Sequence, residues 1–314
     1  MSAEDRVDVA VIGGGPAGLS AALNLVRARR SVLLVDGNRP RNAATLHSHG
    51  FLTRDGLSPL ELRRLGREEF ERYPGASVAS AQVDVLRGEH DGFLLQGRGV
   101  RGGASVDVRA GAIVLATGLR ESLPAFPSIR AWYGTDLHSC MECDGWEKAD
   151  RRLALIGESA DLADRALLLR QWSSDVVVFT CGSTAVTDRE ERSLAERGIR
   201  VERRAVTDVV GEAGHMTGVL LEDGSVLERD AGFVRPTWQP MLEFASELGL
   251  AVDAEGLLVV DAHGRTSVPG VYAAGDITPP GPEQLIVAAG EGARVAATLN
   301  RDLVGALHLP DASV

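Results

Sequence analysis

The sequence predicts an α/β protein with two similar strand–helix–strand (βαβ) domains, on the basis of two observations. Residues 7–36 have the order of a short apolar strand, a glycine-rich turn, a helix and a second strand. The same order returns at residues 151–180. An internal repeat of one βαβ unit indicates two domains of the same type, and 314 residues are enough for both.

The opening unit is predicted from three runs. Residues 7–13, VDVAVIG, are apolar and β-branched, which is typical of a buried parallel strand. Residues 19–30 are rich in alanine and leucine and end in basic residues, which favours a helix. Residues 31–36, SVLLVD, complete the unit as its second strand.

Later runs add a different pattern. Residues 78–115 alternate short apolar stretches with glycine-rich turns, which predicts an antiparallel section that leads into a buried strand at 112–118. Residues 217–229 contain the Asp-Gly turn of a hairpin. Residues 268–299 predict a strand, a loop with three prolines and a helix of small residues.

Composition excludes several function classes. The chain is 44% hydrophobic and 25% charged, as in ordinary globular proteins, and its net charge of -11 disfavours nucleic acid and anionic membrane surfaces. No stretch approaches 18 consecutive apolar residues, and the N-terminus lacks the pattern of a secretory signal. We therefore expect a cytoplasmic protein without a membrane span, in which the three cysteines do not build a disulfide scaffold.

The first glycine turn has the spacing of a dinucleotide site. Gly13 permits the tight turn, Gly15 lets the backbone approach a pyrophosphate, and Gly18 allows close contact between helix and strand. The helix that follows presents free N–H groups to the phosphates, and Asp36, at the end of the next strand, can accept hydrogen bonds from a ribose. A lone motif of this kind is weak evidence, but its position between a strand and a helix supports it.

Two later segments favour a flavin as part of the dinucleotide. AIVLATG at 112–118 and GVYAAGD at 270–276 both end buried strands. Asp276 precedes a helix that Glu283, Gln284 and Leu285 would open, and the positive end of that helix suits a negative charge on a flavin ring.

The segment HSCMECDGWE, residues 138–147, holds Cys140 and Cys143 in a CxxC motif. A zinc site needs further ligands at suitable spacing, which the sequence lacks, so we expect no metal. A static bridge would close a very small loop and add little stability. A disulfide that opens and closes fits best, in which one thiolate attacks and the other resolves the mixed disulfide. The simplest interpretation of Cys181 is a small buried hydrophobic residue.

Taken in order, these motifs resemble the low-molecular-weight thioredoxin reductase family of FAD flavoproteins. The matching segments are VIGGGPAGLSAA, ATG at 116–118, CMECDG at 140–145, and VPGVYAAGD at 268–276 followed by EQLIVAAGEG. The segment RNAATLHSHGFLTRDG at 41–56 is similar to a side branch that includes flavin-dependent dithiol oxidases. The resemblance implies two Rossmann-like dinucleotide-binding domains, the second inserted into the first, and a homodimer. FAD would be bound by residues 1–118 and 240–314, and the inserted domain, residues 119–239, would carry the CxxC.

The resemblance also implies roles for individual residues. Cys143 would exchange electrons with the flavin, Cys140 would face the substrate, and Asp144 would donate and accept protons, with a helix-capping or turn aspartate as its alternative. His138 is a candidate assisting base because histidine titrates near pH 7, and a solvent-exposed loop histidine is the alternative. The candidate FAD-binding residues are Gly13, Gly15, Pro16, Ala17, Gly18, Asp36, Gly37, Arg41, Asn42, His49, Ala116, Thr117, Gly118, Gly275, Asp276, Glu283, Gln284 and Leu285. For His47 and His49 a structural role is the alternative to contact with flavin or substrate.

The chain departs from this family at its second turn. Ser159 stands where the second glycine is expected, Leu162 stands where a small residue would pack, and a basic cluster for a 2′-phosphate is missing before the distant Arg189. Glu142 places a negative charge beside the thiols and should raise their pKa. NADPH or NADH is therefore a doubtful cofactor, whereas FAD is expected.

We expect an FAD-dependent thiol–disulfide oxidoreductase that acts on a thioredoxin-like protein or on a small-molecule disulfide or dithiol. The whole-chain resemblance favours a reductase that uses NAD(P)H. The altered second turn favours an oxidase that passes electrons from a dithiol to oxygen. The sequence is also compatible with a redox-sensing flavoprotein and, more distantly, with a dehydrogenase without flavin.

Overall fold

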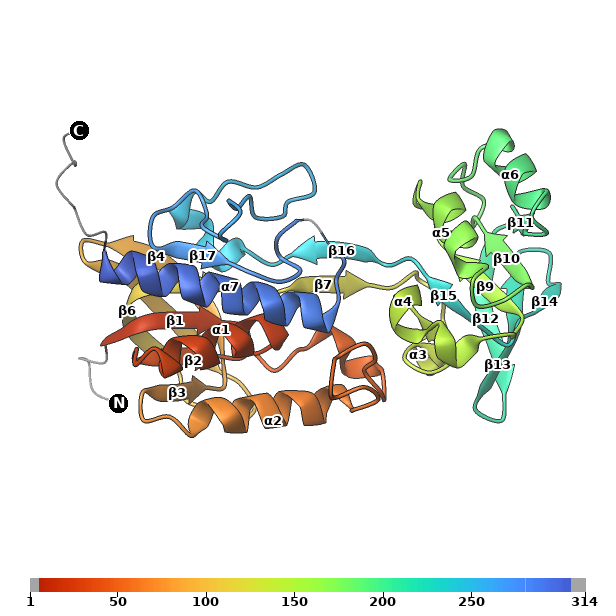
Figure 1. Ribbon diagram of the computed structural model, residues 1–314. Helices are drawn as coiled ribbons and strands as arrows, with labels where there is room; N and C mark the ends of the chain where they lie inside the picture. Colours follow the sequence, from red (N-terminus) through yellow and green to blue (C-terminus); the bar gives the residue numbers. More distant parts are fainter. Residues whose placement is uncertain (1–5, 280, 306–314) are drawn as a thin grey trace, which may run out of the picture. The chain divides into compact units, whose positions relative to one another are not determined.

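The computed structural model describes residues 6–279 and 281–305 (Figure 1). Residues 1–5, which belong to the N-terminal stretch without a secretory signal pattern, and Pro280 of the proline loop lie outside the described residues. Among the described helices, none is both long and apolar enough to cross a membrane.

The helices and strands follow in this order along the chain: β1 (Arg6–Ile12), α1 (Pro16–Arg27), β2 (Val32–Val35), η1 (Arg41–Ala44), α2 (Pro59–Glu71), β3 (Ala76–Ala79), β4 (Ala81–Glu89), β5 (Gly92–Gly99), β6 (Val106–Leu115), β7 (Leu119–Ser122), α3 (Ile129–Trp132), β8 (Leu137–His138), α4 (Met141–Asp144), η2 (Trp146–Lys148), β9 (Leu153–Ile156), α5 (Leu162–Leu169), β10 (Val176–Phe179), α6 (Asp188–Ala195), β11 (Arg200–Glu202), β12 (Val206–Glu212), β13 (His215–Leu221), β14 (Val226–Glu228), β15 (Ala231–Val234), β16 (Thr237–Pro240), η3 (Glu243–Leu248), β17 (Val271–Ala273) and α7 (Leu285–Val304).

The chain divides into two compact units. The first, the FAD-type unit, extends to Arg41, from Gly50 to Arg120 and from Gln239 onward. The second, the redox unit, comprises Asn42–His49 and Glu121–Trp238. The short segment Asn42–His49 therefore belongs with the redox unit, although residues of the FAD-type unit precede and follow it in the chain.

The FAD-type unit contains one mixed sheet in the order β3-β2-β1-β6-β5-β4, with β17 also paired to β6. Strands β1, β2, β3, β6 and β17 run parallel, and β4 and β5 are antiparallel additions. The predicted βαβ opening and the antiparallel section are thus confirmed. In parallel strands of this kind the carboxyl ends meet at one edge, where ligands bind.

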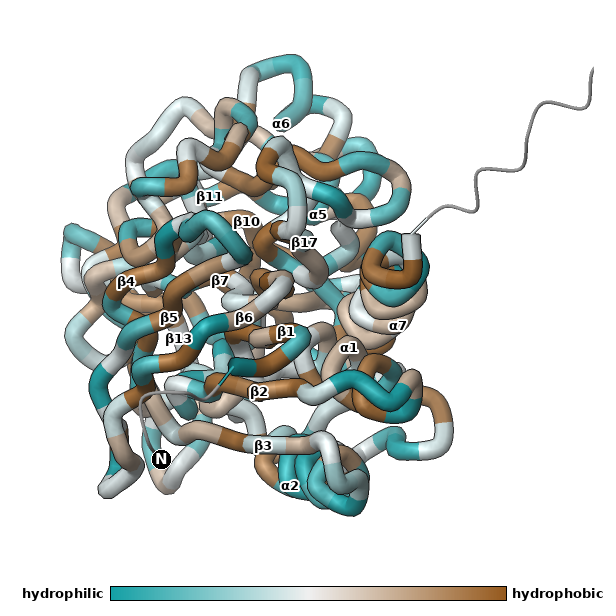
Figure 2. The backbone as a smooth tube through the Cα atoms, turned by 90° about the vertical axis from the view of Figure 1, so that its left-hand side faces the viewer, coloured by the Kyte–Doolittle hydropathy of each residue, from teal (hydrophilic) through white to brown (hydrophobic). Residues whose placement is uncertain are grey.

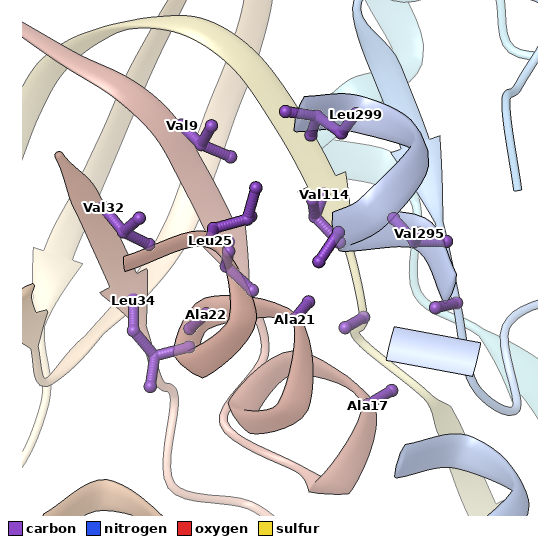
Figure 3. Close-up of a cluster of buried hydrophobic side chains, with 14 of the residues drawn as sticks. Val9, Ala17, Ala21, Ala22, Leu25, Val32, Leu34, Val114, Val295 and Leu299 are labelled. Carbon is purple, nitrogen blue, oxygen red and sulfur yellow. The ribbon is translucent and has the colours of Figure 1, made fainter. Parts of the chain in front are cut away.

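Alternating side chains of these strands fill two cores. Val9, Val32, Leu34 and Val114 point toward α1 and α7, where they meet Leu25 and other residues of these helices (Figure 3). The intervening strand residues face the antiparallel section on the other side of the sheet. Figure 2 shows β2 as hydrophobic, whereas α2 is mostly hydrophilic and so covers the sheet with an exposed outer face.

The redox unit repeats the βαβ arrangement. Its sheet has the order β11-β10-β9-β15-β8 with every pair parallel, and it is covered by α5 and α6 on one face. A separate antiparallel sheet, β12-β13-β14, packs on the other face. The hairpin expected at 217–229 is β13 and β14. The repeat predicted from the sequence is therefore present in the structure.

Candidate functional site

Cys140 and Cys143 form a disulfide in the redox unit, at the start of the one-turn helix α4. Cys140 is the N-cap residue, and its Sγ accepts a hydrogen bond from the Cys143 N–H at 3.1 Å. Met141, between them, is fully buried in the core under α5 and anchors the turn. The cysteines themselves are half-buried.

The glycine after the redox pair is required by packing. A Cβ on Gly145 would lie 2.6 Å from the indole ring of Trp172 and 2.6 Å from the Met141 carbonyl oxygen. Since real Cβ atoms do not approach that closely, only glycine lets α4 rest on Trp172. The Cys-Asp-Gly order thus has a steric reason at its third position.

The backbone before Cys140 is also held in place. Arg165 of α5 donates a hydrogen bond to the Ser139 carbonyl at 2.9 Å, and the Tyr133 hydroxyl donates to the Ser139 hydroxyl at 3.0 Å. These contacts connect the bridge to two further segments of the same unit, which limits its movement.

His138 and Asp144 lie on either side of the bridge in sequence and face each other in space. His138 Nε2 is 3.4 Å from Asp144 Oδ1, and both side chains are largely buried. Burial raises the pKa of Asp144 to about 6 and, together with the charge of Lys148, lowers the pKa of His138 to about 3. The pair therefore takes up its proton on the carboxyl group near pH 6, while His138 stays neutral.

Lys148 is a functional candidate that the sequence did not indicate. It is 3% exposed, donates from Nζ to the Thr135 carbonyl at 3.2 Å, and lies 5.8 Å from the centroid of the Phe233 ring. Burial lowers the pKa of Lys148, and the negative charge of Asp144 opposes this shift. A lysine beside a redox motif is usually a solvated surface group, so no local pattern could have identified it.

The segment Asn42–His49 brings further polar groups to the redox pair. Thr45 Oγ1 is 3.5 Å from His138 Nε2, and His49 Nε2 is 3.5 Å from Glu147 Oε1. Asn42 and His49 were expected among the FAD-binding residues, and the structure places both in the redox unit. Their proposed contact with FAD stays a prediction.

Glu142 is exposed, and its Oε2 lies 4.0 Å from Cys140 Sγ. At this distance its charge opposes formation of a Cys140 thiolate, as the sequence suggested. The remaining cysteine, Cys181, is half-buried, and burial raises its pKa to about 11. It is therefore a thiol rather than a thiolate at neutral pH. Within the described residues no cluster of His, Cys, Asp or Glu could hold a metal ion.

The first glycine turn, in the FAD-type unit, has the geometry that its spacing predicts. A Cβ on Gly13 would lie 2.1 Å from the Ala116 carbonyl oxygen, and a Cβ on Gly18 would lie 1.8 Å from the Gly13 carbonyl oxygen. A Cβ on Gly15 would meet no described atom within 4 Å. Gly13 and Gly18 thus allow close backbone packing, and the space in front of Gly15 is open for a phosphate.

The same turn yields a testable contrast between two substitutions. Gly15 has φ −81° and ψ −177°, which alanine adopts readily, so we expect Gly15→Ala to change the stability of the flavin-free protein by less than about 0.5 kcal/mol. Its methyl group would occupy the open space, and the FAD dissociation constant should rise at least about tenfold. Thermal unfolding and flavin fluorescence titration measure the two effects.

Gly18→Ala is the matched control. Its methyl group must displace the Gly13 backbone, so we expect it to destabilise the protein by about 1–3 kcal/mol even without flavin. A Gly15→Ala variant that binds FAD as tightly as the parent would contradict the assignment of this turn.

Asp36 is buried and already engaged by neighbours that the sequence did not indicate. Its Oδ1 accepts the Asn38 N–H at 2.8 Å, and its Oδ2 receives Arg63 and Arg67 of α2, each at 2.6 Å. Arg63 also donates to the Gly14 carbonyl at 3.2 Å and to Asn38 Oδ1 at 3.2 Å. The only sign of this arrangement in the sequence is the spacing of four residues between the two arginines, which puts both on one helix face.

A second group of candidate FAD residues gathers at the start of α7. Arg41 forms an ion pair with Asp276 at 2.9 Å, and Glu291 of α7 accepts the Gly275 N–H at 2.8 Å. Burial raises the pKa of Asp276, and the charge of Arg41 opposes the shift. A cavity of about 250 Å³ lies here, lined by Gly275, Asp276, Glu283 and their neighbours.

The hydroxyl of Thr117, at the end of β6, is buried and has no hydrogen-bond partner among the described residues. An orphaned buried hydroxyl is costly unless a ligand or water satisfies it. Together with the open Gly15 turn, it indicates that this edge of the sheet fits a polar ligand such as FAD. The FAD-type unit contains the following candidates: Gly13, Gly15, Pro16, Ala17, Gly18, Asp36, Gly37, Arg41, Ala116, Thr117, Gly118, Gly275, Asp276, Glu283, Gln284 and Leu285.

The corresponding turn of the redox unit is different. Helix α1 begins directly after Gly15, but α5 begins only at Leu162, and a turn from Ser159 to Leu162 takes the place of its first helical residues. Asp161 at the N-cap pairs with Arg235 at 3.2 Å, and Asp164 adds a second carboxylate to the first turn. Two carboxylates at the start of α5 oppose the binding of a pyrophosphate, although Arg235 offsets part of the charge of Asp161.

The arginines that follow β11 are also paired. After β11, Arg203 is paired with Glu191 at 2.6 Å and Arg204 with Asp223 at 2.6 Å. Each of these guanidinium groups has its own carboxylate partner, so neither leaves an uncompensated positive charge for a 2′-phosphate. The second turn therefore differs from the first at the positions where a dinucleotide's phosphates would bind.

Comparison with known proteins gives consistent results. Residues 7–292 match the family model described as pyridine nucleotide-disulphide oxidoreductase. The structure of HlmI is 40% identical, with a TM-score of 0.87, and covers 97% of this chain and 94% of that one. An oxidoreductase from Agrobacterium tumefaciens is 32% identical, with a TM-score of 0.86 and coverage of 95% and 99%. A thioredoxin reductase from Listeria innocua serovar 6a is 26% identical over 93% of this chain and 92% of its own length.

Proposed function

Because this chain belongs to the pyridine nucleotide-disulphide oxidoreductases and is thioredoxin reductase-like, we propose that it is an FAD-dependent enzyme in which Cys140 and Cys143 oxidise a dithiol substrate. Enzymes of the thioredoxin reductase type use FAD, with NADPH as electron donor. The observation that favours the oxidising direction here is the second turn, where α5 starts late and carries Asp161 and Asp164.

FAD fits the chain's own residues. Gly13, Gly15 and the start of α1 would hold its pyrophosphate, Asp36 would accept from the ribose, and the start of α7 would lie toward its flavin end. When bound, FAD supplies a two-electron acceptor that the cysteine pair can reduce and dioxygen can reoxidise.

The cysteines carry the thiol chemistry. A substrate thiolate attacks Cys140 Sγ, which forms a substrate–Cys140 disulfide and releases the Cys143 thiolate. The second substrate thiolate then attacks the substrate sulfur of that mixed disulfide, closes the substrate's own disulfide and releases the Cys140 thiolate. The cysteine pair now holds two electrons, and with dioxygen as the final acceptor the sum is one dithiol plus O₂ to one disulfide plus H₂O₂.

Asp144 accepts a proton in this scheme, and His138 orients its carboxyl group. Since burial raises the Asp144 pKa to about 6, its carboxylate is available above that pH to accept a proton from the attacking substrate thiol. His138, neutral because burial lowers its pKa to about 3, lies 3.4 Å away and orients that carboxyl group. Lys148 stabilises the carboxylate from inside the unit.

The flavin spectrum tests the direction of electron flow. Under anaerobic conditions we expect dithiothreitol, used as a small dithiol, to bleach the visible absorbance of the bound flavin, and NADPH or NADH to leave it unchanged on the same timescale. Admission of air should restore the colour and produce one H₂O₂ per dithiol oxidised. Rapid bleaching by NADPH would overturn the proposal.

A reductase that takes electrons from NADPH to a thioredoxin-like protein is the second candidate, because thioredoxin reductases match nearly the whole chain. It predicts the opposite outcome in the same experiment. The homodimer and the cytoplasmic location implied by the sequence also stay proposals, and light scattering of the purified holoenzyme tests the first.

A further inference from the structure

The structure points to a functional role for two arginines on α2 that the proposed chemistry does not use. We propose that Arg63 and Arg67 form a cationic clamp that binds the ADP half of FAD, by fixing Asp36 and by supplying positive charge for the pyrophosphate. This inference depends on FAD binding and not on the direction of electron flow, so it can fail or succeed independently of the proposed function.

The buried cluster around Asp36 has an unequal charge balance. The side chains of Asp36 and Arg63 are 5% and 12% exposed, and that of Arg67 is 33% exposed. Among the ion pairs of the described residues, both guanidinium groups pair with the same carboxylate oxygen, Asp36 Oδ2. One carboxylate and two guanidinium groups leave one positive charge uncompensated by these ion pairs, and the part-exposed Arg67 can offer that charge to an anion from solvent. The planar guanidinium group matches the geometry of a phosphate as well as that of a carboxylate.

The clamp also lies in the position that an ADP group requires. Arg63 Nε donates to the Gly14 carbonyl at 3.2 Å, inside the glycine turn, and its Nη1 reaches Asn38 Oδ1 on the loop after β2. The arginine thus spans the two segments between which the ADP half of a dinucleotide binds in a βαβ unit. The first turn of α1 contains no acidic residue that would compensate the charge instead.

Helix α2 gives both arginines a rigid support. Ser58 caps this helix by accepting the Glu61 N–H at 3.2 Å, and Pro59 occupies its first position. Gly66, on the turn between the arginines, lets α2 approach α1, since a Cβ there would lie 3.2 Å from Leu19 Cδ1. The guanidinium groups are therefore held beside the turn by a docked helix.

The same Asp36 contacts limit its role toward the ribose. Oδ2 already accepts from both arginines, and Oδ1 already accepts from the Asn38 N–H. A carboxylate oxygen has two acceptor positions, so Oδ1 retains one for a ribose hydroxyl. Affinity for the ADP half then depends more on the clamp than on Asp36 alone.

The test measures FAD binding to single glutamine variants. We expect Arg67→Gln and Arg63→Gln to raise the FAD dissociation constant at least about tenfold. FAD should also dissociate faster when the holoenzyme is diluted, which the rise of flavin fluorescence measures. Arg64→Gln is the matched control, because Arg64 lies on the same helix but pairs with Glu61 and Glu68 on its exposed side. It should change the dissociation constant less than about twofold.

Salt dependence separates charge from structural support. If the clamp attracts the pyrophosphate, FAD binding should weaken with salt in the parent and less steeply in Arg67→Gln, and Arg67→Lys should restore the slope. An unchanged slope in Arg67→Gln, or equal affinity in the Arg63, Arg67 and Arg64 variants, would overturn the proposal. If Arg63→Gln does not fold, Arg67→Gln and Arg67→Lys, with the more exposed side chain, still decide the outcome.

Discussion

Serine in place of Cys143 is expected to lower the rate of dithiol oxidation by at least about a thousandfold while the protein remains yellow. The disulfide links Cys140 and Cys143 alone, so the variant cannot form the bridge that accepts the substrate's electrons. FAD binding should persist, since the glycine turn and the start of α7 belong to the other unit. Oxygen consumption with a dithiol and the flavin spectrum measure the two properties.

The two single cysteine variants should differ in a way that tests their roles. In Cys143→Ser the remaining Cys140 can form a mixed disulfide with an oxidised substrate, and mass spectrometry should find that adduct. In Cys140→Ser the remaining thiol, Cys143, should form less of the mixed-disulfide adduct, because Cys140 is the residue assigned to face the substrate. Equal adducts in both variants would contradict the assignment.

Cys181→Ser is the matched control for loss of a thiol. Burial raises the pKa of Cys181 to about 11, so it contributes no thiolate near neutral pH, and its replacement should leave the rate unchanged. Full activity in Cys143→Ser would rule out the cysteine mechanism.

Asparagine in place of Asp144 is expected to lower kcat/KM for the dithiol about a hundredfold at pH 7.5. The amide keeps the size of the side chain but cannot accept a proton. In the parent enzyme the pKa of the Asp144 carboxyl group is raised to about 6. Below that pH the base is protonated, so activity should fall. The ratio of the parent rate to the variant rate should therefore shrink toward pH 5. Ionisation of the substrate's own thiols affects both rates equally, so its effect cancels in this ratio.

Stability provides the control for this variant. The pKa of Asp144 is raised on folding, so the folded protein binds the proton more tightly than the unfolded chain. This contribution stabilises the fold below about pH 4 and is lost as pH rises to 6, so the ionised side chain is a cost at neutral pH. Asp144→Asn should melt at the same temperature as the parent or higher at pH 7.5. A lower melting temperature, or a ratio that does not change with pH, would contradict the proposed role.

The sequence determined the two βαβ units and the positions of both glycine turns, because these depend on local patterns. Gly13, Gly15 and Gly18 lie within six residues of one another, and the structure gives each of the three the steric surroundings expected of it, although the backbone that approaches Gly13 is that of the distant Ala116. The weakness of the second turn was also visible, since Ser159 and Leu162 stand at defined positions. The structure added the late start of α5, which depends on how the turn folds.

Other features of the site were decided only by tertiary packing. Lys148 beside Asp144, His49 beside Glu147, and the α2 arginines on Asp36 join residues whose partners no local pattern specifies. These pairings, and the shifted pKa values of Asp144 and Lys148, depend on burial, which is a property of the whole fold rather than of any short segment. The sequence by itself therefore determined which chemical groups the protein carries. The tertiary structure decided which of them share a low-dielectric environment, and it is there that charges interact strongly enough to set proton affinity and ligand binding.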